Sequence, residues 1–242
     1  VNSNLLLASD GKNSFIRKMF KTPIYSKDYK KKAIVVNFYH SKNHQNTAYE
    51  FFLKNGPLAI LPMQNNKNEF QSSIVWTNTS EFINSLISLD DKKVIDILNS
   101  KIQGSIGEIK KIITKQTFTL RAHLNSKFYE KRTVYIGDSA HSFHPIAGQG
   151  WNLGMQDVEN LYKLVKKYNS LGLELGDEIF CKEFQKNNFF KAYRLYQITD
   201  KVDSVFKLDN TFFNQARFSA INLMEKSKKL KNQISDFAMG IN

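Results

Sequence analysis

The residues best suited to chemistry lie at 132–161, in the segment RTVYIGDSAHSFHPIAGQGWNLGMQDVENL. A β-branched and aromatic run at 133–136 predicts a short strand, and Gly137 predicts the turn that ends it. Asp138 then stands at the carboxyl end of this strand, where its carboxylate is suited to accept a hydrogen bond from a sugar hydroxyl. Two imidazoles, His141 and His144, follow closely.

A glycine-rich loop and a helix follow the histidines. Gly148 and Gly150 lack a Cβ atom, so the backbone there can approach a flat or charged ligand. Apolar residues at roughly helical spacing predict a helix that begins at this loop, namely Leu153, Met155, Val158 and Leu161. The first-turn N–H groups of such a helix have no intrahelical partner and carry a positive dipole end, which suits an electron-rich oxygen.

Two other interpretations of this segment were weighed. The series Gly148-x-Gly150-x-x-x-Gly154 is one residue too long for a dinucleotide fingerprint and does not follow a strand directly. Asp138, His141 and His144 could be metal ligands, but Pro145 disfavours a helix that would bring all three to one face. Since no other ligand cluster supports a metal site, we predict none.

The segment resembles the second FAD-contacting motif of the class A flavoprotein aromatic hydroxylases, the p-hydroxybenzoate hydroxylase-like group. Within that group it is most similar to the ubiquinone-biosynthesis hydroxylases. The matching residues are Gly137-Asp138-Ser139-Ala140-His141, His144-Pro145, Gly148-Gln149-Gly150, Asn152-Leu153-Gly154 and Asp157. Ser139 stands where the family has alanine, and Trp151 where it has a smaller apolar residue.

The resemblance implies roles for these residues. Asp138 would bind the pyrophosphate and ribityl part of FAD, and His144 and Pro145 would lie beside the flavin where the substrate docks. A purely structural role for His144 stays open, and Asp157 is given no chemistry. The isoalloxazine would be lined by Gly148, Gln149, Gly150, Trp151 and Asn152.

A second, shorter motif lies near the start of the chain. An apolar run at 4–8 predicts a buried strand that leads into Asp10 and Gly11, with Arg17 further on. This resembles the family's Asp-Gly motif, which implies that these three residues lie near the FAD pyrophosphate. In the family a strand, a Gly-x-Gly-x-x-Gly turn and a helix come well before this motif, whereas only nine residues precede Asp10. The chain is therefore expected to be the C-terminal part of a hydroxylase, incomplete and inactive alone, and to bind FAD poorly.

The expected fold class is α+β, with the remainder of an α/β FAD domain, an antiparallel substrate-domain sheet and a helical C-terminal tail. The expected parts are a partial FAD domain at 1–30, the substrate domain at 31–122, the second part of the FAD domain at 123–205, and C-terminal helices at 206–242. Strands are expected at 33–39, 48–54, 58–63, 73–77 and 117–123. Helices are expected at 82–89, 93–102, 177–208, 210–223 and 228–239, the first capped by Ser80.

Composition narrows the classes of protein. Of 242 residues, 41% are hydrophobic, and no apolar run approaches the ~20 residues that a membrane span needs. The single cysteine, Cys181, allows no intrachain disulfide and fits a reducing cytoplasm. The net charge of +13 is spread over scattered lysines without a nucleic-acid reader motif, so no nucleic-acid partner is expected. It suits weak attraction to an anionic membrane, which would place the protein in the cytoplasm with peripheral membrane contact or in a ubiquinone-biosynthesis complex.

Taken together, the resemblance implies an FAD-dependent monooxygenase that hydroxylates an aromatic ring, with NADPH or NADH as reductant and O2 as co-substrate. The expected substrate is a small aromatic molecule, a polyprenylated phenol on the way to ubiquinone. Two alternatives stay open: a non-catalytic fragment of such an enzyme, and a basic module that binds anionic surfaces.

Overall fold

The structure is a computed structural model that describes residues 2–53, 55–66, 69–102, 104–143 and 150–207, together with 227 and 232. Four of the expected site residues, His144, Pro145, Gly148 and Gln149, lie outside this described part of the chain. The helices expected at 210–223 and 228–239 also lie outside it, apart from residue 232.

The chain divides into two compact units, one of residues 1–27 with 121–242 and the other of residues 28–120. Two long strands, β2 (Ile24–His40) and β6 (Ile109–Asn125), each begin in one unit and end in the other. The domain boundaries expected after residues 30, 122 and 205 stay a prediction. Both strands are longer than the sequence pattern indicated, because their polar, lysine-rich halves show no apolar alternation.

The second unit is built on antiparallel strands. Its strands belong to a six-stranded sheet in the order β3 (Tyr49–Leu53), β4 (Gly56–Pro62), β5 (Phe70–Thr79), β2, β6 and β9 (His141–Ser142). Strand β9 and the end of β6 with which it pairs lie in the first unit. The turn between β3 and β4 needs glycine, because a Cβ on Gly56 would lie 2.4 Å from the carbonyl oxygen of Thr77. The strands expected at 48–54 and 58–63 are confirmed as β3 and β4, which pair antiparallel around this turn.

Two helices, α2 (Ser80–Ser88) and α3 (Asp91–Ile102), pack against this sheet. The expected cap was wrong by one residue: the Thr79 hydroxyl accepts the N–H of Phe82 at 3.3 Å, and Ser80 is the first helical residue. The core of the unit joins sheet residues to helix residues and includes Ile34, Phe38, Ile60, Trp76, Ile83, Leu86, Leu98 and Ile102.

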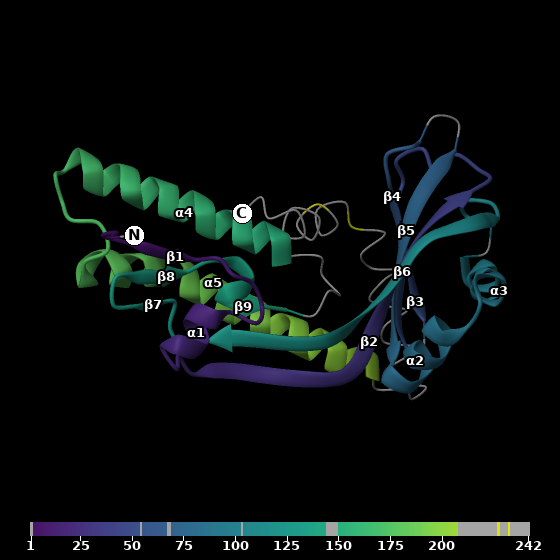
Figure 1. The fold of residues 1–242 in the computed structure, drawn as a ribbon, viewed down its shortest axis with the longest axis horizontal. Coiled ribbons are helices and arrows are strands. Elements are labelled where there is room, and N and C mark those ends of the chain that lie inside the picture. Colours follow the sequence, from purple (N-terminus) through teal and green to yellow (C-terminus); the bar gives the residue numbers. More distant parts are fainter. Residues whose placement is uncertain are drawn as a thin grey trace. The chain divides into compact units, whose positions relative to one another are not determined.

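The first unit has a small sheet covered by two long helices (Figure 1). Strand β1 (Leu6–Ala8) pairs in parallel with β8 (Thr133–Tyr135), and β7 (Tyr129–Glu130) pairs antiparallel with β8. A short 3-10 turn, η1 (Gly137–Ser139), follows β8. The helices are α1 (Phe15–Met19), α4 (Gly150–Ser170) and α5 (Glu178–Lys207), and the shared core includes Ala8, Val134, Leu161, Leu164, Phe180 and Phe184.

Helix α4 departs from the expected pattern in one respect. Leu153 and Leu161 are buried against the sheet, as the spacing predicts. Met155 and Val158 were expected on the same face but are 48% and 46% exposed. Their positions in the helical turn place them on a different face from the leucines.

Two observations concern the environment of the fold. No helix in the described part of the chain is both long and apolar enough to cross a membrane. The Cys181 thiol is buried and unpaired with another cysteine, and burial raises its pKa to about 11. A thiol in that state is a poor nucleophile.

Candidate cofactor-binding site

The Asp-Gly motif forms the capped start of helix α1. The Asp10 carboxylate accepts the N–H groups of Phe15 at 2.7 Å and Ile16 at 3.2 Å, and the Ser14 hydroxyl accepts that of Arg17 at 3.0 Å. Partial burial acts to raise the pKa of Asp10, but hydrogen bonds from Ser14 and the backbone outweigh it and lower that pKa. Asp10 therefore fixes the turn that contains Gly11, and its carboxylate stays ionised.

Arg17 joins the first motif to the second. It is only 7% exposed, and its Nη1 donates to His123 Nε2 and to the carbonyl oxygen of Ser139, both at 3.0 Å. Its Nη2 donates to the carbonyl oxygen of Lys12 at 2.6 Å. Burial lowers the pKa of Arg17, yet a guanidinium stays charged at neutral pH. The structure thus places Arg17 in the protein interior, where three contacts fix the two motifs to each other.

The contact with Arg17 determines the protonation of His123. A guanidinium can only donate, so Nε2 of His123 must accept and the ring must be neutral with its proton on Nδ1. Burial lowers the pKa of His123 to about 3, helped by the positive charges of Arg17 and Lys12. His123 is therefore a fixed acceptor and does not exchange protons near neutral pH.

The Gly-Asp motif presents one exposed acid beside a buried anchor. Asp138 is exposed on η1, and its carboxylate has no hydrogen-bond partner among the described residues. Next to it the Ser139 hydroxyl donates to the carbonyl oxygen of Ala8 and accepts the N–H of Ile136 at 3.1 Å. This serine, which replaces the family's alanine, ties the end of β1 to the turn that carries Asp138.

A buried His–Asp pair supports the same turn. Oδ2 of Asp157 lies 2.7 Å from Nε2 of His141 and accepts the backbone N–H of Gly137 at 3.0 Å. Both side chains are almost fully buried, at 0% and 1% exposure. Asp157 was given no chemistry from the sequence, although its position between Leu153 and Leu161 on the apolar face of the helix was a usable signal.

Close glycine packing brings helix α4 onto the turn. A Cβ on Gly154 would lie 3.5 Å from the Cα of Gly137, so the helix and the turn touch almost backbone to backbone. The glycines of the motif therefore serve helix–turn packing as well as ligand approach. This contact brings the start of α4 and η1 into one local structure.

Among the described residues, no atom covers the amino terminus of α4 at Gly150. A Cβ on Gly150 would meet no heavy atom within 4 Å in the described structure, and Trp151 is 76% exposed. The first turn, which contains Asn152, holds no acidic residue. Its N–H groups and positive dipole end are suited to an electron-rich oxygen. Of the expected cofactor residues, the structure brings Asp10, Gly11, Arg17, Asp138, Gly150, Trp151 and Asn152 into the same unit.

The metal alternative gains no structural support. Among the described residues there is no group of three or more His, Cys, Asp or Glu side chains able to hold a metal ion. Asp138 is exposed, whereas His141 is buried and engaged by Asp157. The donors that are present instead suit an organic cofactor with hydroxyl groups and electron-rich oxygens.

An exposed acid after a parallel strand, near the amino terminus of a helix, is an arrangement that occurs in nucleotide-cofactor sites of α/β sheets. The model of the family described as FAD binding domain matches residues 1–170. The chain belongs to this family.

Relatives with assigned names support the same class. The chain is 30% identical over 240 residues to the ubiquinone hydroxylase UbiL of Rhodospirillum rubrum, covering 99% of this chain and 55% of that protein. It is 25% identical over 270 residues to the human mitochondrial ubiquinone biosynthesis monooxygenase COQ6, covering 98% of this chain and 57% of that protein. The chain thus spans little more than half the length of these relatives.

Solved structures agree on the fold. The p-nitrophenol 4-monooxygenase PnpA of Pseudomonas putida matches with a TM-score of 0.70 at 14% identity, over 97% of this chain and 58% of that one. The Diels-Alderase PyrE3 of pyrroindomycin biosynthesis also matches with a TM-score of 0.70, at 13% identity, over 98% of this chain and 50% of that one. Likeness at this level of identity shows the α+β fold alone, and it is shared by proteins with different activities.

Proposed function

We propose that this chain supplies part of the FAD site of a monooxygenase that hydroxylates an aromatic ring. The observation that carries the proposal is the exposed Asp138 carboxylate on η1, fixed by buried contacts near the amino terminus of α4. An acid in this position can accept hydrogen bonds from the hydroxyl groups of a ribityl chain. The family match over residues 1–170 supports FAD as the cofactor.

Some of these side chains would bind the cofactor, and others would position the residues that bind it. Asp138 would hold a cofactor hydroxyl, while Arg17 and Asp157 act through other residues by fixing the turn that carries it. Asp10 and Gly11 would place the first turn near the pyrophosphate. Helix α4 would stabilise negative charge on a nearby oxygen through the N–H groups that begin at Gly150.

When bound, FAD would supply the redox chemistry: with two electrons from NADH or NADPH and with O2, one oxygen atom would go to the ring and the other to water. The chain's part is to orient the cofactor and to exclude water from it. His144 and Pro145 would lie beside the ring system, where the substrate docks. In this reaction class no nucleophilic triad or paired carboxylate is needed.

We further propose that the substrate is a polyprenylated phenol in ubiquinone biosynthesis. The names of two relatives support this, since one is a ubiquinone hydroxylase and the other a ubiquinone biosynthesis monooxygenase. A substrate with a long prenyl chain resides in a membrane. The net charge of +13 would favour peripheral contact with an anionic membrane surface. Membership of a ubiquinone-biosynthesis complex is an alternative that the relatives' names suggest.

The experiment uses the protein produced from its native gene, with FAD, NADH or NADPH, and a prenylated phenol under isotopically labelled O2. We expect mass spectrometry to find one labelled oxygen atom in the phenol, in amounts that depend on FAD. Oxidation of the nicotinamide without oxygen in the phenol would refute the proposed substrate class. A protein that binds no FAD under any condition would refute the proposed function as a whole.

Membrane contact is tested separately by sedimentation with vesicles. Binding to vesicles that contain anionic lipid should fall steeply as salt rises, whereas neutral vesicles should bind little protein at any salt concentration. Equal binding to both kinds of vesicle would contradict the electrostatic account.

A further inference from the structure

Four large apolar side chains are exposed in the short stretch that holds α1 and the start of β2. They are Phe15, Met19, Ile24 and Tyr25, which are 71%, 54%, 43% and 53% exposed. Single exposed apolar side chains are normal on a protein surface, but four within eleven consecutive positions indicate an interaction site. We call residues 12–27 the α1 segment, and all of them lie in the first unit.

The inner face of α1 is fixed to that unit. Arg17 is buried with its contacts to His123 and to the carbonyl oxygen of Ser139, and Ile16 packs against the core of the unit. The Asp10 carboxylate also accepts the N–H groups of the first two helical residues. The α1 segment therefore cannot turn its exposed side chains inward without breaking these contacts.

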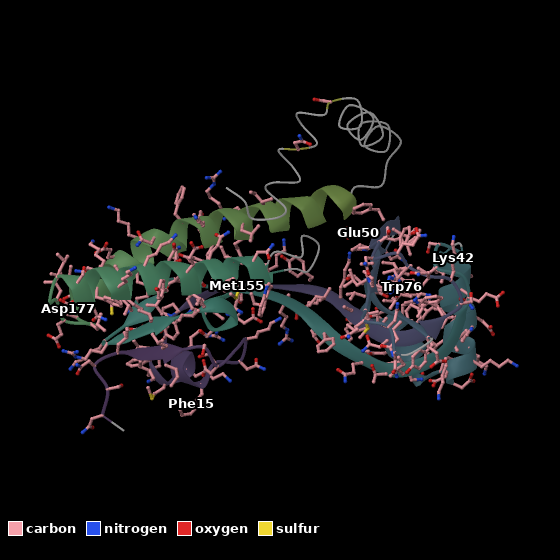
Figure 2. The ribbon with its side chains drawn as sticks, turned by 90° about the horizontal axis from the view of Figure 1, so that it is seen from above. Phe15, Lys42, Glu50, Trp76, Met155 and Asp177 are labelled. Carbon is pink, nitrogen blue, oxygen red and sulfur yellow. The ribbon has the colours of Figure 1, made fainter. Side chains whose placement is uncertain are left out.

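The outer face of α1 carries Phe15, Lys18 and Met19. At about 100° per residue these three positions lie within roughly 100° of one another, whereas Arg17 lies almost opposite Phe15. Figure 2 shows Phe15 on the side of α1 that is turned away from α4 and α5. An aromatic ring and a thioether chain thus point outward beside an ammonium group.

The charges of the α1 segment all have one sign. It contains four lysines and one arginine, with no Asp or Glu. The arginine is the buried Arg17, whereas Lys18 and Lys21 are exposed. Glu130 of β7 bonds to the segment, but this acid is paired with Lys127 at 2.7 Å. The exposed side of the segment is therefore both apolar and positively charged.

We propose that the outer face of the α1 segment is the surface by which the protein docks on an anionic lipid bilayer. Phe15, Met19 and Tyr25 would enter the interfacial layer of the bilayer, and the lysines would lie among the anionic headgroups. The inference rests on the membrane contact proposed above and assigns that contact to particular residues. It uses no side chain that is proposed to bind the cofactor.

A protein partner fits the α1 segment less well. Lysine is depleted in the buried core of protein interfaces and arginine is enriched there, yet the exposed bases of the segment are lysines. An ammonium group on a long stem can instead reach a headgroup while its methylene groups lie along the apolar side chains. A bilayer also requires no complementary shape, so a small face is sufficient for weak, reversible binding.

The test is sedimentation of the protein produced from its native gene with vesicles of equal parts phosphatidylcholine and phosphatidylglycerol. Phe15→Ser and Lys18→Glu should each weaken binding, and the two together should weaken it at least about tenfold. Ile179→Ser and Lys166→Glu are the matched controls, because Ile179 is 69% exposed on α5 and Lys166 is exposed on α4. The two control changes together alter the net charge equally, yet they should leave binding within about twofold of the parent, since salt screens charges away from the bilayer.

Fluorescence gives a second readout of the same contact. Phe15→Trp places an indole on the proposed surface, and lipids with brominated acyl chains should quench its emission in the anionic vesicles. Ile179→Trp keeps the same two native tryptophans as background and should be quenched no more than the parent. Equal quenching of the two variants would contradict the proposed surface.

Three further results would overturn the inference. One is a parent protein that does not sediment with the anionic vesicles. Another is equal loss of binding in the α1 variants and in the controls, which would leave the membrane contact but not this surface. The third is a dimer, found by light scattering after gel filtration, that Phe15→Ser dissociates, because a second copy would then be the occupant. The variants should keep the melting temperature and the FAD affinity of the parent, so a failure here is distinct from a failure of the proposed function.

Discussion

Replacing Arg17 by methionine removes the side chain that joins the two cofactor motifs, and it should destabilise the protein even without cofactor. Arg17 Nη1 contacts His123 Nε2 and the Ser139 carbonyl at 3.0 Å each, and Nη2 contacts Lys12 at 2.6 Å. The Ser139 carbonyl keeps a second donor, Asn125 Nδ2 at 3.1 Å. Lys12 is only half-buried, so its carbonyl can turn to water.

The cost therefore centres on His123, whose Nε2 would be left buried without a donor. An unsatisfied buried polar group costs about 1–3 kcal/mol, and losing hydrogen bonds to a charged group adds to this. We expect the free energy of unfolding to fall by about 2–4 kcal/mol, a large share of the ~5–15 kcal/mol typical of a domain. Methionine keeps most of the apolar stem, so a cavity contributes little.

The assay is chemical denaturation of the cofactor-free protein, with Lys18→Met as the control because Lys18 is an exposed neighbour on the same helix. The variant should also weaken the dependence of stability on pH as the pH falls toward 3, since Arg17, after burial, contributes to the lowered pKa of His123. Surface substitutions usually change the free energy of unfolding by no more than about 0.5 kcal/mol. If the free energy of unfolding of Arg17→Met is that close to the value of the parent, Arg17 does not link the two motifs structurally. A loss confined to flavin affinity would make it a direct cofactor ligand instead.

Three further predictions concern the same site. His123 has a folded pKa of about 3 against an ordinary 6.5, so the unfolded chain binds the proton first and stability should fall as pH drops from 6.5 toward 3, by up to about 1.4 kcal/mol per pH unit. His123→Gln, which still accepts from Arg17 but cannot titrate, should flatten this slope in denaturation measured at pH 4.5–6.5; an unchanged slope would assign it to other groups. Asp157→Asn places an amide where two donors, His141 and Gly137, point at one oxygen, so calorimetry should show that the free energy of unfolding falls by about 1–3 kcal/mol. An unchanged melting temperature would mean that the His141–Asp157 pair does not support the turn. Gly150→Val should leave the melt of the cofactor-free protein nearly unchanged, since its Cβ meets no described atom, but should slow anaerobic flavin reduction by NADPH or NADH in the native-gene protein; reduction at the parent rate would mean that the loop does not lie against the flavin.

Much of the fold could be predicted from local pattern. The run LLLA and the run TVYI were expected as strands and form the parallel pair β1 and β8, and the helix expected after the glycine-rich loop is α4. Strand β8 and the core face of α4 are buried, which leaves an apolar pattern in the sequence. Strand β1 was expected to be buried, but only Ala8 in it is buried, whereas Leu6 and Leu7 are exposed. The fold class, α+β with an antiparallel sheet, is confirmed for the same reason.

The predictions that were incomplete or wrong concern features that tertiary contacts and local geometry determine. Residues 24–32 of β2 are mostly polar and only Tyr29 among them is buried, so their extended structure comes from pairing with neighbouring strands rather than from an apolar period. Both Thr79 and Ser80 carry a hydroxyl that can accept a capping bond, so residue type alone does not decide which of them caps α2.

The site shows the same division. The exposed carboxylate of Asp138 was predicted from residue type and position after a strand. The supporting roles depend on contacts between distant residues: Arg17 and His123 lie 106 positions apart in the sequence, and His141 and Asp157 lie 16 apart. Spacing along the sequence cannot reveal such pairs, although an aspartate on the apolar face of α4 was a detectable signal.

The most direct test of the central claim is the affinity of the native-gene protein for FAD before and after Asp138→Asn. Loss of a charge-assisted hydrogen bond of about 1.5–3 kcal/mol should weaken binding roughly ten- to a hundredfold in a fluorescence titration. Stability without cofactor should not change, because Asp138 is exposed and has no partner among the described residues. Asp96→Asn, which removes an exposed carboxylate from α3, should leave the affinity as it was. Unchanged FAD affinity in the Asp138 variant would show that this acid is only a turn residue and would contradict the proposed cofactor site.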